Sequence, residues 1–556
     1  MRPRVIVALV PLAMAAICAD GRAVQQAPPE VPPALAPAPP AAIERARANG
    51  VQFEQAVAAA RRLLHAWLAH ADARTTLLPD RIDADRSTWV YTPHNSGADL
   101  YPYLVLTAQL TDPDLYEGRM QEMLRNEIRF TSAQASVPGN LMFTTGELGP
   151  PSLFGAGEYA KDGLVSVTEY LGRTPWFYRM VDLMADAMAQ APVTTRFGKL
   201  PASDTELNGD YLQTLTRLVM MTGDRRFLEW ARRIGDAYVD EVLPGNFGVP
   251  GMKWDFAAHT GDRRLRLRDH GNETVVGLTL LVALEQQLGS DRAPRYRAAV
   301  QRMLDRILQS AAPDGMLYNE VDAETLAPID SRLSDNWGYV YGAVYTYYQV
   351  TGDTKYREAV RRVLGSLPAY RKYAWEPGRN PPLGSFDGYA DAIEGAIYLV
   401  NREPVSEALD WIESETQVML GMQRADGHIE DWYGEGNFNR TALLYAYMKS
   451  LGVRPVRWEP GVQVGSVRDG TRLVMSLTAP APRRIRFDFA RHRRVLNLEQ
   501  NFVRLNEFPE WFTVDENSLY RIGRAGTSGE IRLGSELIAG VTLEAGQWIV
   551  EPVAGR

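Results

Sequence analysis

Seven apolar segments recur along the chain between residues 99 and 452. Each is apolar or aromatic on nearly all sides, as in "ETVVGLTLLVALEQQLG" at 273–289, which is typical of a helix covered on two faces. Successive segments start 50 to 63 residues apart, which suits one helical hairpin plus a loop. The starts fall near residues 99, 159, 210, 273, 336, 388 and 438.

A polar turn and an amphipathic helix follow six of the seven apolar segments. The turn "TGDRRF" (222–227), for example, leads into "LEWARRIGDAYVDEVL" (228–243), and Asp and Gly are suitable turn and N-cap residues. The seventh segment has no partner after it, whereas the amphipathic stretch 53–70 has no apolar helix before it. Pairing these two ends predicts a mainly α fold, a closed α/α toroid of six or seven helical hairpins over residues 43–452. An open solenoid is the alternative.

The last hundred residues have a different period. Stretches such as "GTRLVMSLTAP" (470–480) and "GVTLEAGQWIVEPV" (540–553) alternate apolar and polar positions between Gly and Pro breaks. Residues 453–556 are therefore predicted to form a small antiparallel β-sandwich. We interpret it as a structural support and favour this over an independent carbohydrate-binding domain.

The N-terminus has the pattern of an export signal. Arg2 and Arg4 precede the apolar run "VIVALVPLAMAAIC" (5–18), which is short for a membrane span. We predict a signal peptide over 1–19, a Pro/Ala-rich extended linker over 20–42, and a periplasmic or extracellular protein. Cys18 is the only cysteine, so the mature chain would contain no disulfide. Lipidation of Cys18, giving an outer-membrane lipoprotein anchored there, is the alternative, although Ile17 fits that motif poorly.

Composition and charge exclude some classes of function. Hydrophobic residues make up 45% of the chain and charged residues 23%, as in ordinary globular proteins. The net charge of −8 and the pI of about 5.6 argue against nucleic acid as a partner. The sequence has no P-loop, dinucleotide fingerprint or serine-hydrolase elbow. We expect neither a cofactor nor a metal.

Polar residues gather just before the apolar segments. In a closed ring these helices run the same way, so the loops before them would meet at one face. N-capping accounts for about half of these residues, but not for clusters such as "RLRDHGNE" (266–273). Carboxylates, amides and aromatic faces together are what a sugar site needs. The predicted substrate-binding residues are His94, Asn95, Lys161, Arg268, Asp269, Asn272, Arg332, Asn336, Trp337, Asp387, Tyr389, Trp432 and Glu435.

Helical hairpins with polar loops at one face resemble the six-hairpin glycosidase superfamily. The resemblance covers about residues 50–452 and rests on architecture and loop composition, not on a catalytic signature. Within that superfamily the chain is most similar to the uronate-sugar branch, such as unsaturated glucuronyl hydrolases, and to α/α-toroid polysaccharide lyases. The resemblance implies that acids at the starts of inner helices carry the chemistry. Asp99, Asp210, Glu273 and Asp335 hold such positions.

Glycoside hydrolysis uses two carboxylates across the scissile bond. We predict a hydrolase of uronic-acid-containing oligo- or polysaccharides, with Asp210 and Asp335 as acid and base. Glu273, Asp99 and His270 are further candidates, and Glu273 would be kept ionised by the helix dipole. Arg266, Arg268, Arg332 and Lys161 favour an anionic sugar, unless they pair with neighbouring acids.

Three other functions compete with hydrolysis. A polysaccharide lyase would use His94, Asn95 or His270 to neutralise the uronate, and Tyr211 or Tyr339 as base. A non-catalytic glycan-binding protein would need the aromatic residues only. A metal enzyme could use His270 and Glu273, although a helix-cap histidine is the favoured interpretation of that pair.

Overall fold

The computed structural model describes residues 34–132, 135–269, 271, 273–377 and 380–553. The predicted signal peptide, Cys18 and the linker as far as residue 33 lie outside these residues, and so do His270 and Asn272. Among the helices in this described part, none has the length and apolar character to cross a membrane.

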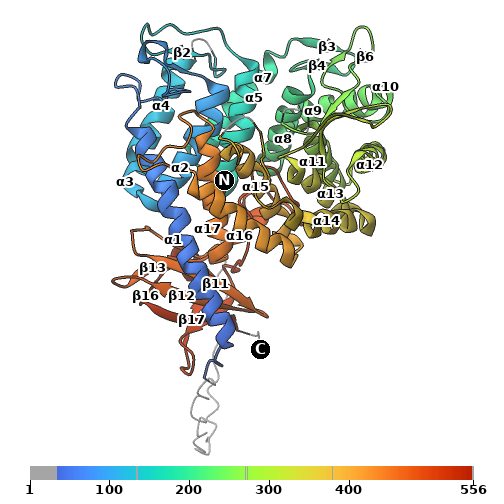
Figure 1. Cartoon of the computed structure of the whole chain (residues 1–556). Coiled ribbons are helices and arrows are strands. Elements are labelled where there is room, and N and C mark those ends of the chain that lie inside the picture. The colour runs from blue at the N-terminus through green and yellow to red at the C-terminus, as the bar shows by residue number, and fades with distance from the viewer. Residues whose placement is uncertain (1–33, 133–134, 270, 272, 378–379, 554–556) are drawn as a thin grey trace, which may run out of the picture.

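Seven long apolar segments form the inner layer of the helical body (Figure 1). Each contacts the next in chain order, and the last of them contacts the first. Their side chains are buried on nearly every face, because helices surround them on both sides. The segments are η2 and α2 (Pro93–Leu100 and Tyr101–Thr111), α5, η4 and α6 (Leu153–Glu158, Tyr159–Leu164 and Val165–Leu171), α8 (Thr205–Thr222), α11 (Glu273–Gln287), α13 (Trp337–Thr351), α15 (Phe386–Arg402) and α17 (Glu435–Ser450).

Amphipathic helices pack against the outside of this layer, and the mainly helical fold is confirmed. They are α4 (Gln121–Thr131), α7 (Pro175–Ala189), α9 (Arg225–Ala237), α12 (Ala293–Ser310), α14 (Thr354–Ser366) and α16 (Ser406–Gly421). The long helix α1 (Pro40–Leu68) contacts both α17 and α2, which is the pairing that the sequence predicted for residues 53–70.

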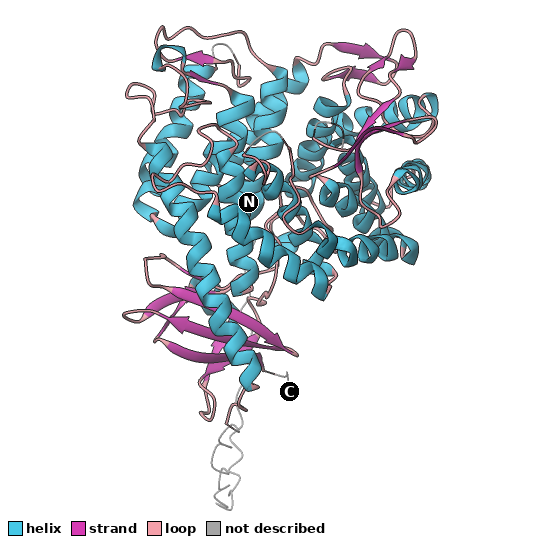
Figure 2. Cartoon of the chain, in the orientation of Figure 1, coloured by secondary structure: helices cyan, strands magenta, loops and turns pink. Residues whose placement is uncertain are grey.

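Short antiparallel strands lie at the face where the inner helices begin (Figure 2). Strand β7 (Arg264–Arg266) pairs with β8 (Tyr318–Asp322), which pairs with β9 (Pro328–Leu333). These strands carry the chain into α11 and α13. They therefore hold the segments that precede two inner helices against each other.

The C-terminal residues form two antiparallel sheets, and strands β11 and β12 of the larger sheet lie against α1 (Figures 1 and 2). One sheet has the order β11–β12–β17–β14–β15 (Gln463–Asp469, Arg472–Thr478, Gly546–Pro552, Leu519–Gly523 and Glu530–Leu533). The other has the order β10–β13–β16 (Arg454–Pro455, Arg483–Arg486 and Val541–Leu543).

Residues 488–514 form a long connection that extends away from these sheets, and we call it the insertion loop. Its ends are held together, because the Val514 amide donates to the Asp488 carbonyl at 2.9 Å. Its middle reaches the inner helices, where Thr346 and Ser166 donate to the carbonyls of Val503 and Asn506, both at 2.8 Å. The C-terminal domain thus contacts the interior of the helical body.

Candidate active site

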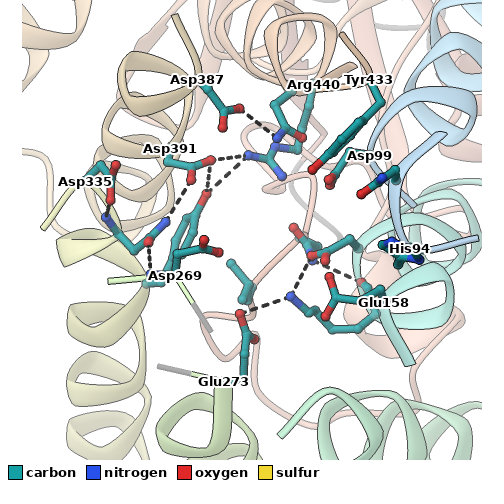
Figure 3. Close-up of a pocket in the computed structure, with 18 of the residues that line it drawn as sticks. His94, Asp99, Glu158, Asp269, Glu273, Asp335, Asp387, Asp391, Tyr433 and Arg440 are labelled. Carbon is teal, nitrogen blue, oxygen red and sulfur yellow. Dashed lines mark hydrogen bonds and ion pairs between the residues drawn. The ribbon is translucent and has the colours of Figure 1, made fainter. Parts of the chain in front are cut away.

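A cavity of about 370 Å³ lies where the inner helices begin. Figure 3 shows its side chains converging from different helices. Among the described residues its lining contains three cations, Lys161, Arg268 and Arg440, against nine carboxylates. The carboxylates are those of Asp99, Glu158, Asp162, Asp269, Glu273, Asp335, Glu376, Asp387 and Asp391.

Lys161 forms the centre of one cluster in this cavity. Its Nζ lies 2.8 Å from Asp162 Oδ1, 3.0 Å from Glu273 Oε1 and 3.6 Å from Asp210 Oδ1. Burial opposes the charge on Lys161, but the surrounding carboxylates raise its pKa well above the ordinary value. The ammonium group therefore stays charged and compensates several acids at once.

Asp162 is the acid of this cluster that stays ionised. It lies in η4, a π-helical turn, and such turns are frequent at functional sites. Burial opposes ionisation, yet Lys161 and hydrogen bonds hold the pKa of Asp162 below its usual range. One of these bonds comes from Asn506 Nδ2, 3.0 Å from Asp162 Oδ1.

Asp99 lies in η2, the π-helical turn that packs beside η4. Among the described residues, no hydrogen bond or ion pair holds its carboxylate. Burial, and then the nearby charge of Asp162, raise the pKa of Asp99 well above the ordinary value. Two neighbouring carboxyl groups in one cavity thus have pKa values shifted in opposite directions.

A second cluster surrounds Arg440 on the other side of the cavity. Arg440 pairs with Asp391 Oδ1 at 2.7 Å and with Glu394 Oε2 at 2.5 Å. Asn336 Nδ2 donates to Asp391 Oδ2 at 2.8 Å, and the Tyr339 hydroxyl lies 2.6 Å from Glu394 Oε2. Burial raises the pKa of Glu394 to about 7. Asp391, Glu394 and Arg440 were not predicted from the sequence, although charged residues inside apolar helices were a usable signal.

Arg268 links a third group of acids. Its guanidinium pairs with Glu376, and its Nε lies 3.6 Å from Asp335 Oδ1. Burial raises the pKa of Asp335 to about 7, although Arg268 opposes that rise. The basic side chains of the cavity are thus paired with acids, which is the alternative that the sequence left open.

Most of the predicted site residues line the cavity. Those that do are His94, Asn95, Asp99, Lys161, Arg268, Asp269, Glu273, Asp335, Asn336, Asp387 and Trp432. They lie within or just before six of the inner segments, whose starts the sequence had predicted to meet at one face.

Four of the predicted residues lie inside the protein and outside the lining. Asp210, the predicted catalytic acid, has no exposed surface and lies behind Lys161. Trp337 and Tyr389 are core residues with no exposed surface, because their inner helices are covered on both sides. Tyr211, considered as a lyase base, is also buried, and its hydroxyl donates to the Leu153 carbonyl at 2.9 Å.

Two further predictions place a charged residue incorrectly. Arg332 is an exposed residue of β9 that pairs with Asp330 at 2.6 Å outside the cavity lining. Arg266 also lies outside the lining, 3.9 Å from Glu320. Both arginines face acids of the strands β8 and β9, which the sequence pattern did not reveal.

Glu435 is a structural anchor and does not reach the cavity. Its Oε1 accepts from the amides of Ile429, Glu430 and Asp431 at 2.6–2.7 Å. Its Oε2 accepts from Trp67 Nε1 at 2.7 Å and lies 3.1 Å from His428 Nδ1. His428, Asp431 and Glu435 come within 4.8 Å of one another, as metal ligands would. Both Glu435 oxygens already accept hydrogen bonds in this arrangement.

Several lining residues were missed by the sequence analysis. Phe154, Tyr433 and Asn437 lie at or near the starts of inner segments but were not selected. Leu505 and Asn506 come from the insertion loop, in a different domain from the other lining segments. No local pattern signals their position, because only the packing of the C-terminal domain brings them to the cavity.

No family model and no curated protein matches this chain. Solved structures do match, with low TM-scores. An unsaturated glucuronyl hydrolase from Bacillus sp. GL1 has a TM-score of 0.39 and 14% identity, covering 52% of this chain and 85% of its own. A family 76 glycoside hydrolase (mannosidase) from Bacteroides thetaiotaomicron has a TM-score of 0.40 and 11% identity, covering 71% of this chain and 97% of its own. A cellobiose 2-epimerase from Bacillus thermoamylovorans has a TM-score of 0.41 and 11% identity, covering 58% of this chain and 88% of its own. Likeness at this level does not assign an activity.

Proposed function

We propose that the chain is a glycoside hydrolase, with Asp99 as general acid and Asp162 as the basic carboxylate. The observation that carries this is the opposite pKa shift of two neighbouring acids in one cavity. When their environments shift two carboxyl pKa values apart, the group with the raised pKa can act as the acid and the group with the lowered pKa as the base or nucleophile. Hydrolysis of a glycoside requires such a pair.

The proposed chemistry follows from the surroundings of each group. Asp99 protonates the glycosidic oxygen as the bond to the anomeric carbon breaks. Asp162 supplies the negative charge, either by attacking that carbon in a retaining reaction or by deprotonating water in an inverting one. Asp391 and Asn437 offer hydrogen bonds to sugar hydroxyls. Phe154, which is 37% exposed at the cavity, offers an apolar face to a sugar ring.

The test compares Asp99→Asn and Asp162→Asn on oligosaccharides and on aryl glycosides with a good leaving group. We expect both variants to lose at least about a hundredfold in turnover on oligosaccharides, the lower range for acid–base groups. Asp99→Asn should retain activity on the aryl glycoside, since that leaving group needs no proton, whereas Asp162→Asn should not. Asp114→Asn, at a side chain 93% exposed, is the control. Normal turnover in either cavity variant would refute the assignment.

The charge of the substrate is a separate part of the proposal. The sequence resemblance implies a uronate, and Arg268 is the cation through which the cavity would hold one. Arg268 is already paired with Glu376 and faces Asp335, so binding a substrate carboxylate there would require it to give up these acids. We therefore propose a neutral sugar as the preferred substrate. Turnover of a uronate oligosaccharide in preference to its neutral counterpart would contradict this.

A polysaccharide lyase is the second candidate, and His94 is the observation that favours it. Burial lowers the pKa of His94, so the ring is a neutral base at the cavity, and its Nδ1 has no hydrogen-bond partner among the described residues. Tyr339 is a poor base, because burial raises its pKa well above the ordinary value. A lyase product absorbs in the near ultraviolet and a hydrolase product does not. Binding of glycans without either product would indicate a non-catalytic protein.

Two structural expectations belong to the same proposal. We infer that the contacts between successive inner helices, with α17 against α2, close a toroid of seven hairpins. We also expect an exported protein that has lost residues 1–19, either free or anchored through Cys18. Mass spectrometry of the mature protein distinguishes cleavage from lipidation.

A further inference from the structure

The insertion loop forms part of the cavity wall. Leu505 and Asn506 line the cavity beside residues of the helical body. The loop crosses the C-terminal halves of several inner helices, since Gln349 Nε2 donates to the Asn501 carbonyl at 3.1 Å and Arg217 donates to the Leu505 carbonyl. The C-terminal domain therefore closes the inner end of the site.

Buried ion pairs determine where this loop sits. Arg504 lies 3.1 Å from Glu169 of α6 and 3.0 Å from Glu507. Glu507 in turn pairs with Arg402 of α15 at 2.6 Å, and Glu169 pairs with Arg217 of α8 at 2.7 Å. A buried charge that loses its partner is strongly destabilising, so few other placements of the loop are tolerated.

The side chain of Asn506 is directed at the proposed basic carboxylate. Its amide Nδ2 donates to Asp162 Oδ1 and to the Lys161 carbonyl, both at 3.0 Å. Asn506 is 2% exposed and has a φ of 63°, in the left-handed region that Asn tolerates better than most residues. Its own carbonyl accepts from Ser166 Oγ. The side-chain amide of Asn506 thus holds η4, and its backbone carbonyl contacts α6.

We propose that Asn506 is a positioning residue through which the C-terminal domain orients and stabilises the Asp162 carboxylate. This inference rests on the proposed function, in which Asp162 is the basic group. A hydrogen bond to a carboxylate favours its ionised form. Without the Asn506 amide, Asp162 would hold its proton to higher pH and would lose one of the contacts that fix its orientation.

The experiment measures kcat and KM against pH for Asn506→Gly, which keeps the left-handed backbone and removes the amide. We expect kcat to fall at least about tenfold with little change in KM, and the acidic limb of the profile to move upward by about one pH unit. Asn506→Asp, which keeps the side-chain shape and adds a repelling charge, should move the limb further and serves if the glycine variant does not fold.

Asn497→Gly is the matched control. Asn497 is also left-handed, with a φ of 52°, and lies in the same loop, but its Nδ2 donates to the Met220 carbonyl at 2.7 Å, away from the cavity. Its profile should follow that of the wild type. An unmoved acidic limb in the Asn506 variants, or an equal loss in Asn497→Gly, overturns the inference. If the inference about Asn506 is overturned but Asp162→Asn is inactive in the same assay, the proposed function still stands. If Asp162→Asn is fully active, both the proposed function and the inference about Asn506 are refuted.

Discussion

Replacing Glu435 by Gln tests whether this residue belongs to the structure or to the site. One carboxylate oxygen accepts from three backbone amides, so the Gln carbonyl must take that position. The new amide then faces Trp67 Nε1, which is a donor only. His428 can adapt by changing tautomer, but the indole cannot. The substitution therefore places two donors against each other in a site with no exposed surface.

The cost can be estimated from these contacts. The lost bond from Trp67 to a charged acceptor contributes about 1.5–3 kcal/mol, and the unsatisfied buried donors cost about 1–3 kcal/mol more. We expect a destabilisation of about 2.5–6 kcal/mol, which a domain at the middle of the ordinary stability range survives with a lower unfolding midpoint. Activity per folded molecule should remain close to that of the wild type, because Glu435 does not line the cavity.

Urea unfolding followed by tryptophan fluorescence and circular dichroism measures the shift. Glu407→Gln, at an exposed position of α16, is the control and should change stability by less than about 0.5 kcal/mol. Adding Trp67→Phe to Glu435→Gln removes one of the opposed donors, so the double variant should lose less than the sum of the single losses. An unchanged midpoint together with a hundredfold loss of turnover would show that Glu435 acts on substrate after all.

Three further predictions concern charge. Arg268→Gln should change KM equally for neutral and anionic sugars if no substrate carboxylate binds there; a larger rise for the anionic sugar would support a uronate. Asp335→Asn should raise the thermal unfolding temperature more at about pH 8 than at about pH 5. The wild-type carboxyl has its pKa raised to about 7, so ionising it costs increasing stability as the pH rises from the unfolded pKa of about 3.9 through 7. An equal change at both pH values would refute the burial argument. Burial disfavours the charge of Glu510, but His492 lowers its pKa to about 2. Its contribution to stability is therefore present above its unfolded pKa of about 4.3 and is lost as the pH falls toward 2. Glu510→Gln should destabilise the protein at about pH 6.5 and only about half as much at about pH 3, and a constant difference would contradict this.

The sequence predicted the helical hairpins well because their signal is local. An inner helix must be apolar on most faces and an outer helix on one face, and both patterns can be read within fifteen residues. The meeting of the polar loops at one face followed from the same repeat, and residues such as Asp99, Lys161 and Glu273 line the cavity as predicted. The alternating strands of the last hundred residues were equally local.

Only the tertiary structure decided the role of each polar residue. Asp210 and Glu435 have the same kind of sequence context as Asp99, yet one is buried behind Lys161 and the other anchors a loop. The direction of a side chain at a helix start depends on how the helix is rotated about its axis in the packed structure, which an acid just before an apolar run does not encode. Asn506 shows the limit most clearly. It reaches Asp162 across 344 positions of chain, and what brings it there is the packing of charged pairs between two domains, which no local period records.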